Sequence, residues 1–283
     1  MTVAIAVVSA DGLVLAADSR TTFGWGGGPV RVLSDYTHKV FKIDEKVGVA
    51  CFGYAFLRRR NIAAHVEDFI RVKESDQPEA LASEIYAYFS EEFAAHTQQF
   101  PNEAPPPDQA ALGFLVVGYD ENGVGHSYDV LIPGGPEARA NHNTRDNPGA
   151  SWRGQTDVIR RIIKGADLDL LQERAARAGL SAHVDALQEL TTGLEYIVPF
   201  DAMNLQDAVD FAEFAISTTI ATQRFIYGTM GQPGSWPGVG GPVEIGIVTP
   251  RDPFRFISQT DVRSGRWSPT TAELSSGPGE VDQ

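Results

Sequence analysis

The chain has 283 residues, of which 42% are hydrophobic and 21% charged, so it is long enough and apolar enough to bury a sizeable core. Its formal net charge is −14, which argues against nucleic acid or an anionic membrane as the main partner, because both bind clustered lysine and arginine. One cysteine, Cys51, excludes an internal disulfide and suits a reducing compartment. No apolar run approaches the roughly 18 residues of a membrane span, so we expect a soluble, cytoplasmic protein.

The chain is predicted to open with two hairpins made of four strands: Val3–Val8, Leu13–Ala17, Lys39–Ile43 and Val47–Phe52. The first hairpin turns at Asp11-Gly12, a strong turn dipeptide. The glycine-rich segment 23–29 between the hairpins lacks the Lys-Ser/Thr ending of a phosphate-binding loop, so it is read as an exposed loop.

Two amphipathic helices are predicted next, over Tyr54–Glu74 and Glu79–Phe100, because apolar residues recur there at helical spacing. The triplet Arg58-Arg59-Arg60 is read as one turn of the first helix, and the proline-rich segment 101–107 ends the pair. The remaining expected elements follow in chain order: strands Leu112–Tyr119 and Ser127–Ile132, a polar loop at 136–151, helices near Asp157–Lys164, Asp167–Ala178 and His183–Thr192, a long helix Leu205–Phe225, a loop at 231–238, and strands Val243–Val248 and Phe254–Ser258.

This order of elements predicts an α+β protein in which two sheets pack face to face between two helical layers, a four-layer αββα sandwich. A doubly wound parallel sheet is excluded, because the helices do not alternate with the strands. We expect one domain over residues 1–263 and a disordered tail over 264–283, which is rich in Ser, Gly, Pro and Glu.

Thr2 is the candidate nucleophile. An initiator methionine is generally removed when the next residue is as small as threonine, and its removal would expose an α-amine and a hydroxyl on the same residue. The α-amine has a reference pKa of about 7.7–8.0, so a useful fraction is free base near neutral pH and can activate the hydroxyl. The strand that follows would hold this nucleophile still.

Three further residues suit such chemistry. A cation would lower the pKa of the Thr2 hydroxyl, and a carboxylate would hold that cation in place. Asp18 and Arg20 share one face of the second strand, since side chains two residues apart point the same way, and Lys39 begins the third strand near the open end of the first hairpin. Gly53 lies where we expect a strand to turn into a helix, so that its N–H could face a developing oxyanion.

Together, the stretches Thr2–Arg20, Lys39–Ile43 and Gly48–Gly53 resemble the N-terminal third of a proteasome β-type subunit, within the class of N-terminal-nucleophile hydrolases. The Met-Thr start and the stretch Trp152–Thr156 are similar to Anbu, the bacterial proteasome-like group. The resemblance covers residues 2–60 well and the rest of the chain in layout.

The resemblance assigns roles by position. It implies that Thr2 is the nucleophile, that Asp18 and Lys39 are the family's Asp–Lys pair, and that Gly53 is the oxyanion-hole glycine.

The later motifs depart from the family. The Gly-Ser-Gly that precedes a helix is here Gly154-Gln155-Thr156, so Gln155 or Thr156 takes the position of the serine near the α-amine. The family's second aspartate falls near Gln223. These changes leave open that the activity is weak.

The implied function is a threonine-type hydrolase that cleaves peptide or amide bonds through an acyl-enzyme on Thr2, in a self-assembling complex. The alternative, from another class, is a catalytically inactive proteasome-fold subunit that serves as an oligomeric scaffold. We expect a peptide or unfolded-protein substrate, a homo-oligomer (ring or helical) and no cofactor; a regulatory ATPase is left open. Cys51 is read as core, and the six histidines show no metal-ligand spacing such as HExxH.

Overall fold

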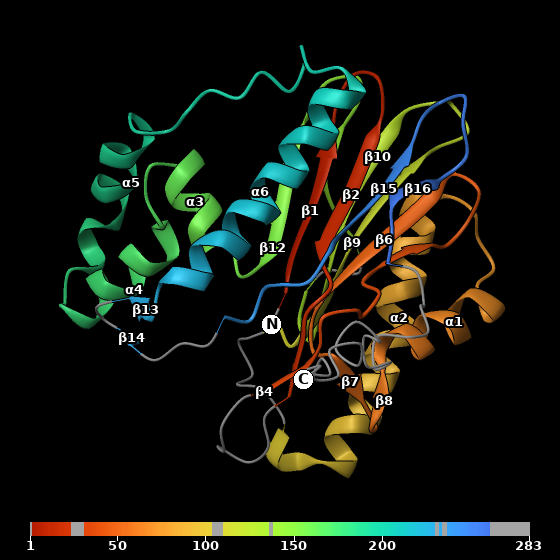
Figure 1. Ribbon diagram of the computed structural model, residues 1–283, viewed down its shortest axis with the longest axis horizontal. Helices are drawn as coiled ribbons and strands as arrows, with labels where there is room; N and C mark the ends of the chain where they lie inside the picture. Colours follow the sequence, from red (N-terminus) through yellow and green to blue (C-terminus); the bar gives the residue numbers. More distant parts are fainter. Residues whose placement is uncertain are drawn as a thin grey trace, which may run out of the picture.

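The computed structural model describes residues 2–23, 31–103, 110–135, 138–229, 232–233 and 237–260. Two five-stranded antiparallel sheets face each other, and helices cover the outer side of each (Figure 1). The predicted α+β sandwich is therefore confirmed. The predicted tail at 264–283 and most of the glycine-rich segment 23–29 lie outside the described residues.

The first sheet has the order β12-β1-β2-β15-β16. Its strands are β1 (Val3–Val8), β2 (Leu13–Asp18), β12 (Gly149–Gly154), β15 (Val243–Val248) and β16 (Arg255–Ser258). β1 and β2 are buried on both faces, which is why their sequences read as continuous apolar runs. Small alanines of both strands face the second sheet, and branched residues of β1 face the helices.

The second sheet has the order β11-β10-β9-β6-β5. Its strands are β5 (Val40–Lys42), β6 (Val47–Gly53), β9 (Leu112–Tyr119), β10 (Gly125–Ile132) and β11 (Arg139–Asn143). The strand β5 lies at the edge of this sheet, a position that matters for the site below.

Helices α1 (Ile62–Val72) and α2 (Pro78–Gln99) cover the second sheet, and α3 (Asp157–Ile163) and α6 (Leu205–Phe225) cover the first, with α4 (Leu168–Arg177) and α5 (Val184–Thr192) beside α3 (Figure 1). Three short strand pairs and two 3-10 turns complete the described elements: β3 (Thr21–Phe23), β4 (Arg31–Ser34), β7 (Phe56–Leu57), β8 (Arg60–Asn61), β13 (Gly228–Thr229), β14 (Gln232–Pro233), η1 (Pro101–Glu103) and η2 (Ser181–His183). None of the helices in the described ranges is long and apolar enough to cross a membrane.

One predicted helix begins later than expected. It was placed over Tyr54–Glu74, but the β7–β8 hairpin comes first and α1 starts only at Ile62. Arg58 and Arg59 have φ values of 48° and 63°, which a right-handed helix does not allow, so reading the arginine triplet as a helical turn is wrong. The helix begins after Asn61, whose side chain accepts a hydrogen bond from an N–H of the first turn.

The predicted polar loop at 136–151 is also wrong, because β11 and the start of β12 lie there. β11 carries Arg-Ala-Asn-His-Asn, which has no apolar alternation to mark it as a strand. β12 pairs antiparallel with β1 and places Gly154 opposite Val3. The missed strand therefore lies directly beside the candidate nucleophile.

Candidate active site

Thr2 lies at the start of β1 and is only 4% exposed. Its carbonyl oxygen accepts a hydrogen bond of 2.7 Å from the N–H of Gln155. Gly154, with φ of +88°, allows this approach, because a Cβ there would lie 1.8 Å from the Thr2 carbonyl oxygen. The end of β12 thus fixes the backbone of Thr2.

Asp18, at the end of β2, is fully buried and accepts four hydrogen bonds. Its Oδ1 accepts from Val3 N at 3.0 Å and from Lys39 Nζ at 2.9 Å; its Oδ2 accepts from Arg20 N at 3.1 Å and from Gly240 N at 3.0 Å. A buried carboxylate needs such partners, and the Lys39 ammonium supplies the opposite charge.

Lys39 is buried as well, with 4% exposure. Besides Asp18, its Nζ donates to the carbonyl oxygen of Arg20 at 2.6 Å. Lys39 and Thr2 line the same small pocket, and the N–H of Val3, the residue after Thr2, bonds to the carboxylate that holds Lys39. The structure therefore brings the predicted Asp18, Lys39 and Thr2 together from three different strands or strand ends.

Arg20 contributes to this group mainly through its backbone. Its guanidinium makes a bidentate ion pair with Asp35 at 2.6 and 3.1 Å and donates to the carbonyl oxygen of Pro237 at 3.2 Å. The hydrogen bond to Asp35 raises the pKa of Arg20 above its ordinary value. The Arg20 side chain thus connects the pocket to Asp35 and Pro237, while the Arg20 carbonyl oxygen accepts the hydrogen bond from Lys39.

Gly53 ends β6 with φ of +90° and lines the pocket beside Thr2. A Cβ at this position would lie 2.2 Å from the carbonyl oxygen of Ala111, so only glycine fits. The chain continues into the β7–β8 hairpin and not directly into a helix, which corrects the expectation from the sequence.

The later motifs form a chain of amide hydrogen bonds. Gln155 Oε1 accepts from Gln223 Nε2 at 3.0 Å, and Gln223 Oε1 accepts from Val239 N at 3.0 Å. Thr156 is buried at the N-terminus of α3, where its side chain makes no capping hydrogen bond. Gln155, one of the two residues expected at the position of the serine, and Gln223, expected near the second aspartate, thus bond to each other, and Gln155 also contacts Thr2 through its backbone.

Two residues that the sequence did not point to, Glu244 and His38, lie beside Lys39. Glu244, in β15, is fully buried and accepts hydrogen bonds from Lys39 N at 2.8 Å and from His38 Nδ1 at 2.5 Å. The only signal in the sequence is an acidic residue inside the apolar run Val-Glu-Ile-Gly-Ile-Val. It lies far along the chain from Lys39, so no local motif could have connected the two.

The pocket beside Thr2 encloses about 20 Å³, room for roughly one water molecule. Of the described residues that line it, Arg20, His38 and Lys39 are basic and none is a carboxylate. Cys51 also lines it, but burial raises the pKa of its thiol to about 12, so the thiol stays protonated near neutral pH. This finding agrees with the interpretation of Cys51 as a core residue.

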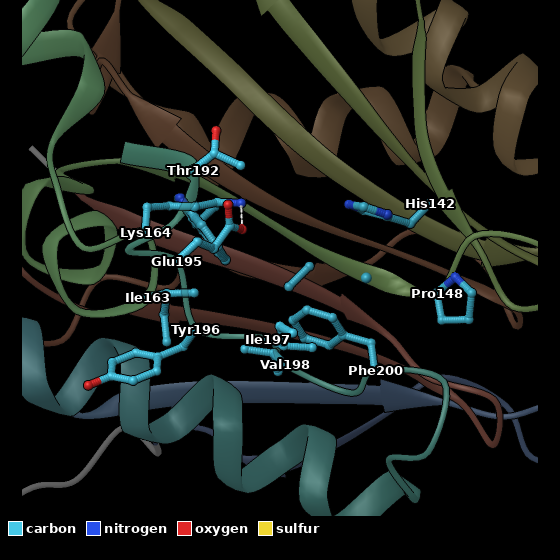
Figure 2. Close-up of a pocket in the computed structure, with 13 residues that line it drawn as sticks. His142, Pro148, Ile163, Lys164, Thr192, Glu195, Tyr196, Ile197, Val198 and Phe200 are labelled. Carbon is cyan, nitrogen blue, oxygen red and sulfur yellow. Dashed lines mark hydrogen bonds and ion pairs between the residues drawn. The ribbon is translucent and has the colours of Figure 1, made fainter. Parts of the chain in front are cut away.

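A larger cavity of about 580 Å³ lies elsewhere, between β12, α3 and the segment before α6. Figure 2 shows the Lys164–Glu195 ion pair on one side of this cavity and His142 on the other, with Phe200 between them. Burial lowers the pKa of His142, whose Nδ1 is buried without a hydrogen-bond partner. Thr192 is the only aliphatic hydroxyl among the described residues that line this cavity, and its carboxylate–lysine pair, Glu195 and Lys164, is partly exposed, whereas Asp18 and Lys39 are buried. The buried pair beside Thr2 is therefore the better candidate site.

The family model for proteasome subunits matches residues 2–135, a span that contains Thr2, Asp18, Lys39 and Gly53. This part of the chain is thus similar to proteasome subunits, and the fold is the α+β sandwich of the N-terminal-nucleophile hydrolases. No curated protein matches the chain. In the described part of the chain, no group of three or more His, Cys, Asp or Glu side chains could hold a metal ion.

Proposed function

We propose that this protein is a threonine-type N-terminal-nucleophile hydrolase that cleaves peptide or amide bonds, with Thr2 exposed as the N-terminal residue by removal of Met1. The observation that carries the proposal is the buried Asp18–Lys39 pair, which is bonded to the residue after Thr2 and shares a pocket with Thr2. The match of this part of the chain to proteasome subunits supports it.

In this mechanism the Thr2 α-amine accepts the hydroxyl proton as Oγ attacks the carbonyl carbon of the scissile bond. The C–N bond breaks, the leaving amine departs with that proton, and an ester forms on Oγ. A water molecule then gives a proton to the α-amine and attacks the ester carbon. The carboxylic acid product leaves, and the proton returns to Thr2 Oγ.

Lys39 stabilises the negative charge that develops on Oγ. A lysine ammonium has three N–H donors, and Asp18 and the Arg20 carbonyl take two of them, which leaves the third for the Thr2 hydroxyl. The N–H of Gly53 is the proposed donor to the oxyanion of the substrate carbonyl. Because the group is buried, these charges act in a medium of low dielectric constant, where they are stronger than in water.

Proteasome subunits generally assemble into oligomeric complexes. We extend this to a homo-oligomer, either a ring or a helical assembly, that acts on peptides or unfolded protein in the cytoplasm with or without a regulatory ATPase. The similarity to the Anbu group, carried by residues Trp152–Thr156, belongs to the same proposal.

The test is hydrolysis of fluorogenic peptides by wild-type protein and two Thr2 variants. Thr2→Ala removes the nucleophile and should abolish turnover, while Thr2→Ser keeps a hydroxyl and should retain part of it. Thr249→Ala, in the turn after β15, is the control and should match wild type. Wild-type turnover by Thr2→Ala would refute the assignment, and a wild-type protein without activity would leave the scaffold alternative.

A further inference from the structure

Glu244 is a buried carboxylate that reaches from the first sheet to the second. In β15 it lies opposite Ala17 of β2, with no exposed surface. Its hydrogen bonds go to three consecutive residues: Oε1 to His38 Nδ1 at 2.5 Å, and Oε2 to Lys39 N at 2.8 Å and to Val40 N at 3.3 Å. All of its partners therefore belong to the segment that carries the Lys39 ammonium.

The position of this segment explains why it needs such a partner. β5 is the edge strand of its sheet, and edge strands leave N–H groups without a ladder partner. Glu244 accepts from two N–H groups at the start of β5. On the other side, the Lys39 carbonyl oxygen accepts from Cys51 N at 2.9 Å. The backbone of Lys39 is thus held from both sheets.

His38 supplies the side-chain contact of Glu244. A carboxylate with no exposed surface is costly unless a cation or several donors accompany it. The His38 side chain is 35% exposed, lines the pocket that Thr2 lines, and contacts Glu244 Oε1 through Nδ1.

We infer that Glu244 is a positioning residue of the active site, which fixes Lys39 through its backbone while Asp18 fixes its ammonium, and that the His38 side chain in turn positions Glu244. The inference rests on the proposed function of Thr2 and Lys39. Holding Lys39 at both ends fixes its place in the pocket that it shares with Thr2, where a misplacement of about 1 Å can lower a rate by about 100-fold.

The matched control for Glu244 is Asp120, in the turn between β9 and β10. Its carboxylate accepts from His126 Nε2 at 3.1 Å and from the N–H groups of Asn122 and Val124 at 2.9 and 2.8 Å, the same set of contacts. This turn lies at the Leu13 end of the sandwich, opposite the Asp18 end, since a Cβ on Gly125 would touch Leu13.

The experiment compares Glu244→Gln with Asp120→Asn in two assays. Hydrogen exchange by NMR measures the protection of the Lys39 and Val40 amides, and peptide hydrolysis measures kcat and KM. We expect Glu244→Gln to lower protection at residues 39 and 40 and to lower kcat about tenfold or more, with KM changed by less than about threefold. Asp120→Asn should leave both measurements at wild-type values.

His38 variants give a second readout if Glu244→Gln fails to fold. His38→Ala removes the side-chain partner of Glu244 and should lower the protection of the two amides. His38→Asn keeps an N–H near the position of Nδ1 and should restore part of the protection.

Unchanged protection in both Glu244→Gln and His38→Ala would overturn the inference. Lowered protection with unchanged kcat would also overturn it. The Glu244 hydrogen bonds to the Lys39 and Val40 backbone would then have no effect on turnover. If wild-type protein hydrolyses no peptide but Glu244→Gln still lowers amide protection, the proposed function is rejected. The structural role of Glu244 in positioning the Lys39 backbone would stand.

Discussion

At the scale of single residues, the site is a set of buried charges that balance one another. Asp18 and Lys39 are both almost completely buried, and each hydrogen-bonds to the other and to nearby backbone groups. Breaking such a pair by removing one partner leaves an uncompensated charge and typically costs about 3–5 kcal/mol. Stability and activity are therefore linked at these two residues.

Replacing Lys39 tests this link. Lys39→Met keeps the length of the side chain but leaves Asp18 buried without a cation, so we expect lower thermal stability and a loss of turnover of at least about 100-fold. Lys42→Met, three residues further along the chain, is the control, because Lys42 pairs with Glu45 at the exposed surface, where a pair is worth about 0–1 kcal/mol. Equal effects of the two substitutions on stability and turnover would contradict the account.

Cys51 offers a test of burial at the same site. Burial raises the pKa of its thiol to about 12, and only the thiolate reacts with iodoacetamide, so the folded protein should resist alkylation at pH 8. The protein unfolded in guanidinium should react within minutes, because the thiol then returns to its ordinary pKa. Rapid alkylation of the folded protein, followed by mass spectrometry, would show that the pocket is open or the thiolate is stabilised.

At the residue scale, the sequence indicated which side chains lie near one another where those residues stand at strand ends in the N-terminal part of the chain. Strand position and the family resemblance led us to expect that Thr2, Asp18 and Lys39 meet, and the Asp18–Lys39 hydrogen bond is present, while the catalytic roles of these residues stay a prediction. Glu244 was missed because its contact with Lys39 depends on how β15 packs against the second sheet. The same limit applies to the bond between Gln155 and Gln223, whose positions were named from the sequence but whose contact was not.

At the scale of elements, β12 connects the second half of the chain to the nucleophile. It pairs with β1 over its whole length and ends at Gly154, whose backbone lies against the Thr2 carbonyl. The ion pair between Arg153 of β12 and the buried Asp129 of β10 joins this strand to the second sheet. Gln155 and Thr156, where the sequence departs from the pattern that the resemblance implies, therefore follow directly after the strand that positions Thr2.

A substitution at Gly154 tests the role of β12. Gly154→Ala places a Cβ 1.8 Å from the Thr2 carbonyl oxygen, so Thr2 or β12 must move, and we expect turnover to fall at least about tenfold with a clear loss of thermal stability. Gly123→Ala is the matched control, since Gly123 also has a positive φ of +72° but no atom within 4 Å of a built Cβ. That control should show only the backbone strain, about 1 kcal/mol, and unchanged turnover.

The elements were predicted unevenly, and for identifiable reasons. β1, β15 and α6 have the predicted bounds because most of their residues follow a clear apolar pattern, as a strand run in β1 and β15 and as a helical face in α6. β11 and β12 were missed because polar residues occupy much of an edge strand that is only half-buried. The early start predicted for α1 followed a helical spacing of apolar residues that the positive φ values at Arg58 and Arg59 interrupt.

At the scale of the whole molecule, the fold leaves large apolar side chains exposed at the end of α6. Phe225 and Tyr227, two residues apart along the chain, are 82% and 79% exposed. Neighbouring exposed apolar residues of this size commonly mark contacts with another protein chain. They fit the proposed assembly, in which each subunit packs against its neighbours.

Sedimentation at micromolar concentration tests the assembly. We expect a species several times the mass of the 30.6 kDa chain, because a proteasome-like site works inside a complex of subunits. Phe225→Ser and Tyr227→Ser together should shift the distribution toward smaller species. A clean monomer for wild type, with no larger species at any concentration tested, would contradict the proposed complex.

The most direct test of the central claim, that Thr2 is the nucleophile, is intact-mass and peptide-mapping mass spectrometry after incubation with an acylating β-lactone. The account predicts a mature chain without Met1 that carries one acyl group per subunit, located on Thr2, with no acyl group on Thr2→Ala. A chain that retains Met1, or a Thr2→Ala variant acylated as efficiently as wild type, would contradict it.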